Sequence, residues 1–206
     1  WTRFRAKAAQ GKADDLAEAD LPGVLAGVTI HDGPPHGPSL ARVAIIQNKA
    51  ARTWAVTAAV THPGIGLSEA GERARQGAGL ADLVDVCART ELIDEVLLMV
   101  RTVPEDGAER DLWIRRHRRP DSPPVARQVN DDLAGALSRA SVRTEVFVTI
   151  VVPETRLSRA AREAGGGLDG RGRILYGLMG EVEGQLRGGL AMTAVTWLTS
   201  PELAVA

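Results

Sequence analysis

The stretch Ser39–Thr61, SLARVAIIQNKAARTWAVTAAVT, predicts two β-strands joined by a tight connection. In its second half, apolar residues at every second position from Trp54 to Val60 alternate with threonines on the other side. This period of two is typical of a strand with one buried face. The first half, residues 41–46, is apolar on both faces, which indicates a strand inside a sheet. A hairpin of this kind needs helices or further strands to cover it.

The rest of the chain supplies that cover. We expect further strands over residues 21–30, 92–103, 143–152 and 192–198, and helices over residues 68–90, 111–119, 125–140, 155–164 and 173–190. Residues 32–38, DGPPHGP, predict a loop by composition. Strands and helices alternate along most of the chain, but the hairpin near its start requires an antiparallel pair of strands. We therefore expect an α+β fold. Its mixed sheet would carry helices mainly on one face and contain ferredoxin-like units.

Three of the helices carry apolar stripes at spacings of three and four, which we interpret as faces turned toward the core. The stripes consist of Leu80, Leu83, Val84 and Cys87 in the first, of Val129, Leu133 and Leu137 in the second, and of Ile174, Leu178, Val182 and Leu186 in the third.

Domain organisation follows from composition. We expect a lead-in segment and first strand over residues 1–38 and an α+β domain over residues 39–206, with two subdomains divided near residues 104–124 as an alternative. Ser200 followed by Pro201 is typical of an N-cap and a first helical position. We therefore expect a helix to begin here and to continue beyond residue 206. We infer that these residues are a fragment of a longer membrane protein.

The totals exclude several classes of protein. The net charge is −1 and aromatic residues are only 3% of the 206, which argues against a bulk attraction to nucleic acid and against base-stacking platforms. No stretch approaches the roughly 20 apolar residues that span a bilayer. The single cysteine, Cys87, excludes a disulfide within the chain and is interpreted as a small buried hydrophobe.

No catalytic constellation, cofactor site or metal site is predicted. Residues 165–170 match the GxGxxG pattern, but they follow a helix where a dinucleotide loop follows a strand. Arg162 with Gly165 and Gly167 also matches a short acyl-CoA loop, which gives an acyl-CoA-dependent transferase as an alternative. His31 and His36 lack a third ligand at a usual spacing, so loop solvation is preferred over a metal.

The densest charge cluster is the basic run at residues 115–119. Its candidate partner-binding residues are Arg115, Arg116, Arg118 and Arg119. A solvated basic face needs no function, whereas a contact with phosphate or an acidic partner is the functional alternative. An acidic protein surface is preferred, because the chain as a whole is near neutral. We interpret Arg3 and Arg5 as part of a solvated first segment. The alternative is a basic stretch next to a membrane-spanning helix.

A family resemblance extends over most of the chain. Its motifs are Trp1–Arg5, Leu21–Ala26, the loop at 32–38 with its hairpin, Gly79–Val84, Thr102–Gly107, Val125–Val152 and Trp197–Leu203. In these the chain resembles membrane-anchored components of actinobacterial conjugative elements, which are type IV secretion-like systems. It is also similar to the non-ATPase N-terminal domain of conjugative transfer ATPases and to EccE of type VII secretion. The segment at Gly66–Ser68 departs from that pattern, since it lacks an aromatic-anchored helix start.

The resemblance implies a scaffold at the cytoplasmic face of the membrane, without chemistry or cofactor. It implies partners among the other secretion or conjugation components, the transfer ATPase included, and a membrane attachment through segments upstream. Weak nucleic-acid binding and assembly into a homo-oligomer stay open as alternatives.

Overall fold

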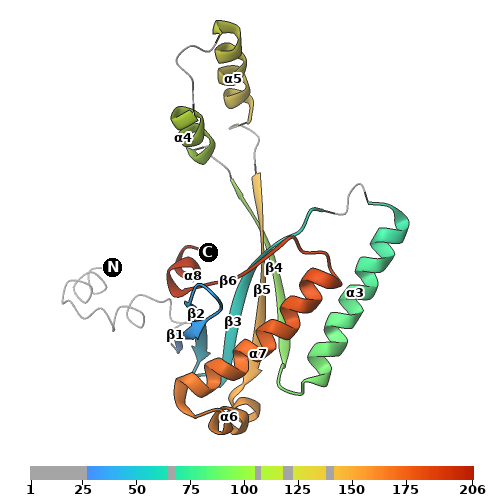
Figure 1. The fold of residues 1–206 in the computed structure, drawn as a ribbon, viewed down its shortest axis with the longest axis vertical. Coiled ribbons are helices and arrows are strands. Elements are labelled where there is room, and N and C mark those ends of the chain that lie inside the picture. The colour runs from blue at the N-terminus through green and yellow to red at the C-terminus, as the bar shows by residue number, and fades with distance from the viewer. Residues whose placement is uncertain (1–26, 65–67, 105–107, 118–122, 138–141) are drawn as a thin grey trace, which may run out of the picture. The chain divides into compact units, whose positions relative to one another are not determined.

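A computed structural model describes residues 27–64, 68–104, 108–117, 123–137 and 142–206. Its elements in chain order are β1 (Val28–His36), β2 (Ala41–Asn48), β3 (Thr53–Thr61), α3 (Ala70–Arg89), β4 (Glu95–Pro104), α4 (Ala108–His117), α5 (Pro124–Leu137), β5 (Val142–Pro153), α6 (Glu154–Glu163), α7 (Gly167–Gly188), β6 (Ala194–Trp197) and α8 (Ser200–Val205). The predicted α+β class is confirmed, with a six-stranded sheet and helices packed on it (Figure 1).

The predicted hairpin is the pair β2 and β3, which are antiparallel with Ile46 opposite Ala55. The expectation of one buried face is wrong for β3, because the five consecutive residues Trp54–Ala58 are all buried, with Val56 and Ala58 fully inaccessible to solvent. Thr57, on the other face, is also buried, and its hydroxyl is 2.9 Å from that of Thr149 in β5. This hydrogen bond explains how a threonine can be buried in the middle of the sheet, since it leaves no polar group unpaired.

The strands lie in the order β1-β2-β3-β5-β4, with β6 paired to β3 beside this path. The backbone N–H of Glu154 donates to the Arg52 carbonyl at 2.8 Å, while Thr57 faces Thr149, so β5 runs antiparallel to β3. β5 therefore has neighbours on both sides, which fits its mostly apolar sequence from Val146 to Val152.

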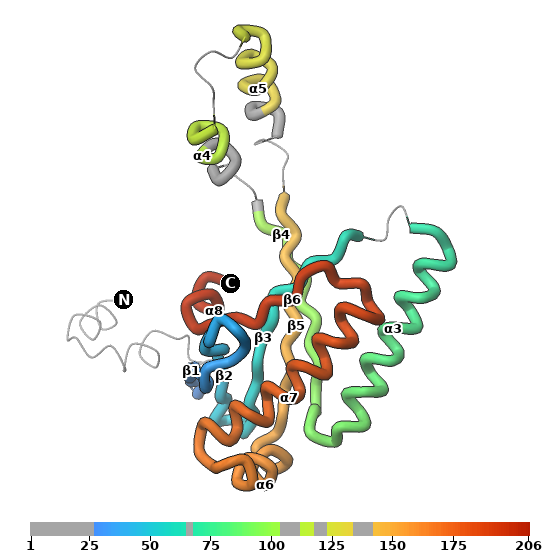
Figure 2. The backbone as a smooth tube through the Cα atoms, viewed as in Figure 1, coloured from blue at the N-terminus to red at the C-terminus, as the bar shows by residue number. Residues whose placement is uncertain are grey.

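The strand β6 lies between β2 and the second half of β3. The Leu198 N–H donates to the Thr57 carbonyl at 2.9 Å, and the Leu198 carbonyl accepts from Ala44 of β2 at 2.8 Å. Along β3, Ala58 to Thr61 pair with β6, whereas the start of β3 pairs with β2. Residues near the end of the chain therefore pair with β2 and β3, which are among the first described strands (Figure 2).

The helix α7 lies across one face of the sheet, with α6 and α3 packed against it (Figure 1). Three of the four residues of its predicted stripe, Leu178, Val182 and Leu186, are at 4% exposure or less, whereas Ile174 is only partly buried. On α3, Leu83 and Cys87 are buried but Leu80 and Val84 are exposed, so only half of that stripe faces the core. The core therefore lies between α7 and the central strands.

The loop predicted at 32–38 is wrong for most of its length, because these residues continue strand β1. Their pairing with β2 shifts register between Asp32 and Pro35, which marks a bulge. β1 is an edge strand, and proline is tolerated at an edge or a bulge because no ladder hydrogen bond is lost there. Tyr176 of α7 donates its hydroxyl to the Pro34 carbonyl at 2.7 Å and so fixes the bulge to the helix.

The end of the chain also differs from expectation. The helix predicted to begin near Pro201 is present as α8. Its N-cap is Thr199 and not the predicted Ser200. Thr199 and Glu202 make a capping box, with the Thr199 N–H donating to the Glu202 carboxylate at 2.8 Å. Threonine satisfies the free N–H groups of a helix start as serine does, so composition alone could not choose between neighbouring positions.

The described residues divide into two compact units. The first runs to Met99 and resumes at Phe147, and the second, residues 100–146, holds the end of β4, α4, α5 and the start of β5. None of the helices in the described parts of the chain is both long and apolar enough to cross a bilayer. The predicted features of the lead-in, Arg3 and Arg5 among them, lie outside the described residues.

Candidate functional site

The helix α4 carries the described part of the predicted basic run. Arg115 and Arg116 occupy its last turn and are exposed, whereas Arg118 and Arg119 lie outside the described residues. Trp113 is 62% exposed, an unusual position for so large an apolar side chain. A surface helix that combines an exposed tryptophan with arginines has the composition found at the centres of protein interfaces.

Trp113 stacks on the ring of His117, with ring centroids 4.3 Å apart and planes 22° from parallel. His117 Nδ1 also lies 2.8 Å from the Trp113 carbonyl oxygen. The two residues are four apart in sequence, a spacing that places them one above the other on a helix. An aromatic pair therefore lies next to the arginines, where no aromatic platform was predicted.

The helix α5 presents an apolar stripe to solvent. Val125, Val129 and Leu133 are 72%, 59% and 48% exposed, and their spacing of four places them on one side of the helix. The stripe predicted to face the core was Val129, Leu133 and Leu137. That prediction is wrong for Val129 and Leu133, which are exposed, and the Leu137 side chain lies outside the described part of the structure. Exposed apolar side chains on one helix face are typical of a surface that binds another protein.

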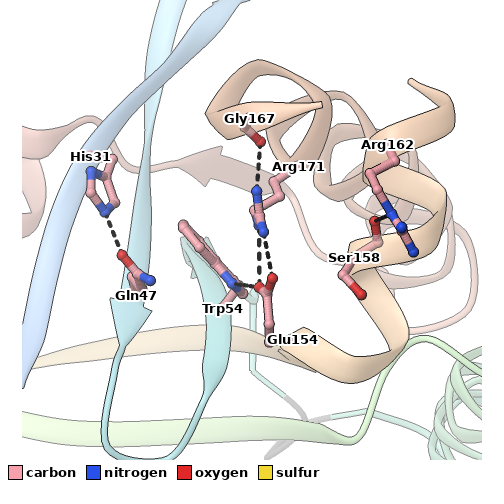
Figure 3. Close-up of polar contacts among 8 residues, drawn as sticks. All are labelled: His31, Gln47, Trp54, Glu154, Ser158, Arg162, Gly167 and Arg171. Carbon is pink, nitrogen blue, oxygen red and sulfur yellow. Dashed lines mark hydrogen bonds and ion pairs between the residues drawn. The ribbon is translucent and has the colours of Figure 1, made fainter. Parts of the chain in front are cut away.

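A second cluster lies in the first unit, where Glu154 joins three elements (Figure 3). Arg171 of α7 holds the Glu154 carboxylate through two nitrogens, with its Nε 3.2 Å from Oε2. The indole N–H of Trp54 in β3 donates to the same carboxylate, and the Arg171 guanidinium lies 5.0 Å from the Trp54 ring centroid. The hydrogen bond from Arg171 is the main cause that lowers the pKa of Glu154, so the carboxylate is held ionised.

This cluster borders an open hollow of about 240 Å³. The hollow is lined by Gln47, Asn48, Lys49, Arg52, Thr53, Trp54 and Glu154. Its one carboxylate is already paired with Arg171, which leaves amide and cationic groups at the rim. The arrangement fixes β3, α6 and α7 to one another, and its residues include no nucleophile placed beside a base. We interpret the cluster as structural.

Replacing Glu154 by glutamine is expected to lower the free energy of unfolding by about 1 to 3 kcal/mol at neutral pH. Because the folded-state pKa is lowered, this stabilisation is present above the ordinary value of 4.5 and is lost as the pH falls through the folded-state value. Urea titrations of both proteins at neutral and acidic pH test this. Glu163→Gln, at an exposed ion pair on α6, is the control and should change stability by less than about 0.5 kcal/mol.

The glycine-rich segment predicted at 165–170 joins α6 to α7, so it lacks the strand that precedes a dinucleotide or acyl-CoA loop. Gly165 and Gly166 have φ of 111° and 73°, which favour glycine. Gly170 lies in α7, buried against Ala161 of α6, where a Cβ atom would overlap the Ala161 carbonyl oxygen. These glycines let two helices approach closely, and this packing role explains the motif.

Arg162, the other residue of the acyl-CoA alternative, donates from its Nε to the Ser158 carbonyl at 3.3 Å within its own helix (Figure 3). Its backbone carbonyl accepts a hydrogen bond from the Gly165 N–H at 3.3 Å, so Arg162 and the glycine segment meet at the end of α6 through backbone atoms.

His31 and His36, the two histidines considered as metal ligands, interact with different residues. His31 Nε2 lies 3.0 Å from the Gln47 side-chain oxygen, and His36 packs on Tyr176 with ring centroids 4.5 Å apart. Asp32, between them, accepts a hydrogen bond from Ser200 at 2.6 Å. Within the described ranges, no group of three or more histidine, cysteine or acidic side chains could hold a metal ion.

Comparisons of the chain with models of known protein families, with curated proteins and with solved structures found no match. The features that bear on function are the exposed side chains of α4 and α5 and the sequence resemblance.

Proposed function

We propose that this chain is a non-catalytic interaction domain of a bacterial conjugation or secretion apparatus, working at the cytoplasmic face of the cell membrane. The observation that carries the proposal is the exposure of apolar and basic side chains on α4 and α5, the helices inserted between β4 and β5. Val125, Val129 and Leu133 of α5 and Trp113 of α4 are largely exposed, so a partner could cover their apolar surface.

The energetics favour a protein partner. Complete burial of an exposed valine or leucine gains about 1.5 to 3 kcal/mol, so covering Val125, Val129 and Leu133 would contribute substantially to binding. Arg115 and Arg116, exposed on α4, would add steering toward an acidic surface. The sequence resemblance suggests that the partners are other components of the apparatus, with the transfer ATPase as the first candidate.

The proposal is tested by replacing Arg115, Arg116, Arg118 and Arg119 together with alanine. Binding of the purified variant to the transfer ATPase of the same genetic element should be lost, and DNA transfer from a strain that carries only the variant should fall at least about tenfold. Circular dichroism should show an unchanged fold, because Arg115 and Arg116, the two of these residues that the structure describes, are exposed.

The matched control replaces Arg75, Arg89, Arg159 and Arg162, four arginines that are exposed elsewhere, and should bind and transfer as the parent does. Equal losses in both variants would indicate a general charge effect and contradict the proposed site. The membrane part of the proposal fails if the gene product carries no hydrophobic segment outside these residues.

Weak, salt-sensitive DNA binding is the expected result for the isolated chain. The four arginines could neutralise about 2 to 4 phosphates, and each should add about 0.9 to the slope of log affinity against log salt concentration. Fluorescence anisotropy with a labelled duplex measures this slope. Tight binding that persists at about 200 mM salt would rank nucleic acid above an acidic protein surface as the partner.

A further inference from the structure

The hollow beside Glu154 is open to solvent and small. Its lining residues come from the end of β2, the start of β3, the connection between these strands and the start of α6, and all of them belong to the first compact unit. Its volume of about 240 Å³ equals that of several water molecules at about 30 Å³ each, so a small polar group fits there.

The two amide side chains of the hollow are left with donor groups. The Gln47 side-chain oxygen lies 3.0 Å from Nε2 of His31 (Figure 3). The Asn48 side-chain oxygen accepts a hydrogen bond from the Ala51 N–H at 2.9 Å. Because both oxygens are engaged, the groups that these amides can offer to a ligand are their NH₂ groups, which only donate. A ligand in the hollow therefore has to supply acceptor atoms.

The carboxylate of the hollow is engaged as well. Arg171 and the Trp54 indole together donate to both oxygens of Glu154, and Arg171 also balances its negative charge (Figure 3). The other two charged residues that line the hollow, Lys49 and Arg52, are cationic and exposed. The rim of the hollow therefore carries more positive than negative charge, which favours an anion.

Arg52 takes its place at the rim in a strained backbone conformation. Its φ is 55°, in the left-handed region that favours glycine, and its carbonyl accepts from the Glu154 N–H at 2.8 Å. The hydrogen bond from Arg171 is the main cause that lowers the pKa of Glu154, and the positive charge of Arg52 lowers this pKa further, so Arg52 lies near the carboxylate. Strained residues of this kind cluster at sites that bind ligands.

We propose that this hollow binds a phosphate group, with Arg52 and Lys49 facing its charge and the amides of Gln47 and Asn48 donating to its oxygens. A phosphate monoester carries about two negative charges and three strong acceptor oxygens, which matches two cations and several N–H donors. A carboxylate would match only one of the cations. This inference does not rest on the proposed function, since it concerns other residues than those of α4 and α5.

Isothermal titration calorimetry of the full chain with inorganic phosphate tests the proposal. Saturable binding of one phosphate per chain is expected, with a Kd of about 1 mM or lower, which a titration to about 20 mM at constant ionic strength resolves. The constant ionic strength separates a specific site from general screening of surface charge. A chain that shows no saturable binding in this range would overturn the proposal.

Two variants of rim residues locate the site. Arg52→Gly should weaken phosphate binding at least about tenfold, because charge-assisted hydrogen bonds are lost. The variant should fold, since glycine adopts a positive φ without strain. Asn48→Asp should weaken binding further by placing a carboxylate against the phosphate, and its side-chain oxygen can still accept from the Ala51 N–H.

Arg89→Ala is the matched control. It removes one exposed positive charge at the end of α3 and should bind phosphate as the parent does. Circular dichroism and thermal unfolding check that the three variants are folded. Phosphate binding that both rim variants leave unchanged would place the bound phosphate elsewhere and would contradict the proposed site.

Vesicles identify the molecule that carries the phosphate group. Vesicles of phosphatidylcholine with and without phosphatidic acid present a phosphate monoester on a lipid, and cosedimentation with the chain measures binding. Binding that requires phosphatidic acid, is displaced by inorganic phosphate and is lost in Asn48→Asp would assign a lipid headgroup to the hollow. Binding of inorganic phosphate without binding to these vesicles would assign a soluble phosphate compound instead.

Discussion

Replacing Gly79 by alanine is expected to destabilise the protein by about 1 to 3 kcal/mol, or more if the helices cannot separate. Gly79 is buried in α3 where this helix meets the end of α7. A Cβ atom there would overlap the backbone carbonyl group of Gly189. Backbone atoms cannot turn aside as a flexible side chain can, so the contact would be relieved only by moving α3 away from α7.

Gly77, two residues earlier in the same helix, provides the control. It is exposed, and no atom lies within 4 Å of the position that its Cβ would take. Gly77→Ala should therefore stabilise the protein by about 0.5 to 1 kcal/mol, since alanine is the better helix former. Urea denaturation of both variants measures the difference. A neutral Gly79→Ala would show that the two helices do not pack this closely in solution.

Val182→Gln is expected to lower the free energy of unfolding by about 3 kcal/mol or more. Val182 lies in the stripe of α7 and is fully buried, so the substitution removes apolar contacts and introduces an amide without a partner. The same substitution at Val129, in the stripe of α5, should change stability by less than about 0.5 kcal/mol. Val129 is 59% exposed, and glutamine suits a helix surface.

Thermal and urea unfolding of the two variants check this pair. Val129→Gln should in addition weaken binding to the transfer ATPase. This measurement distinguishes an apolar stripe that binds a partner from one that only contacts water. A large loss of stability at Val129 would mean that α5 is covered within the chain itself, and the proposed role of its apolar stripe would then be wrong.

The two stripes show how far the sequence could predict the fold. Val182 and Val129 occupy helices with similar apolar spacing, and spacing identifies the apolar face of a helix without showing what covers it. The hairpin was predictable because the alternating residues of β3 follow an apolar run and a polar connection, although β3 is in fact buried on both faces. The extent of β1 was not, because its glycine and two prolines have the composition of a loop, and only the edge position and the bulge make them compatible with a strand.

Some features of the candidate site were likewise predictable from the sequence, and others were not. The arginines of α4 were visible as a charge run, and Trp113 could have been connected with His117 from their spacing of four. The group of Trp54, Glu154 and Arg171 gave no local signal, since Trp54 and Glu154 are 100 residues apart in sequence and meet only in the folded sheet.

The position of β6 between β2 and β3 has a consequence for biosynthesis. Ala58 of β3 pairs with Trp197, so part of this sheet cannot close until nearly all of these residues have left the ribosome. Until then, β2 and β3 expose the backbone groups that later bind Leu198, and contacts so distant in sequence form slowly. The nascent chain should therefore be a substrate for chaperones that shield unpaired strands, and a product truncated before Ala194 should be degraded or aggregate.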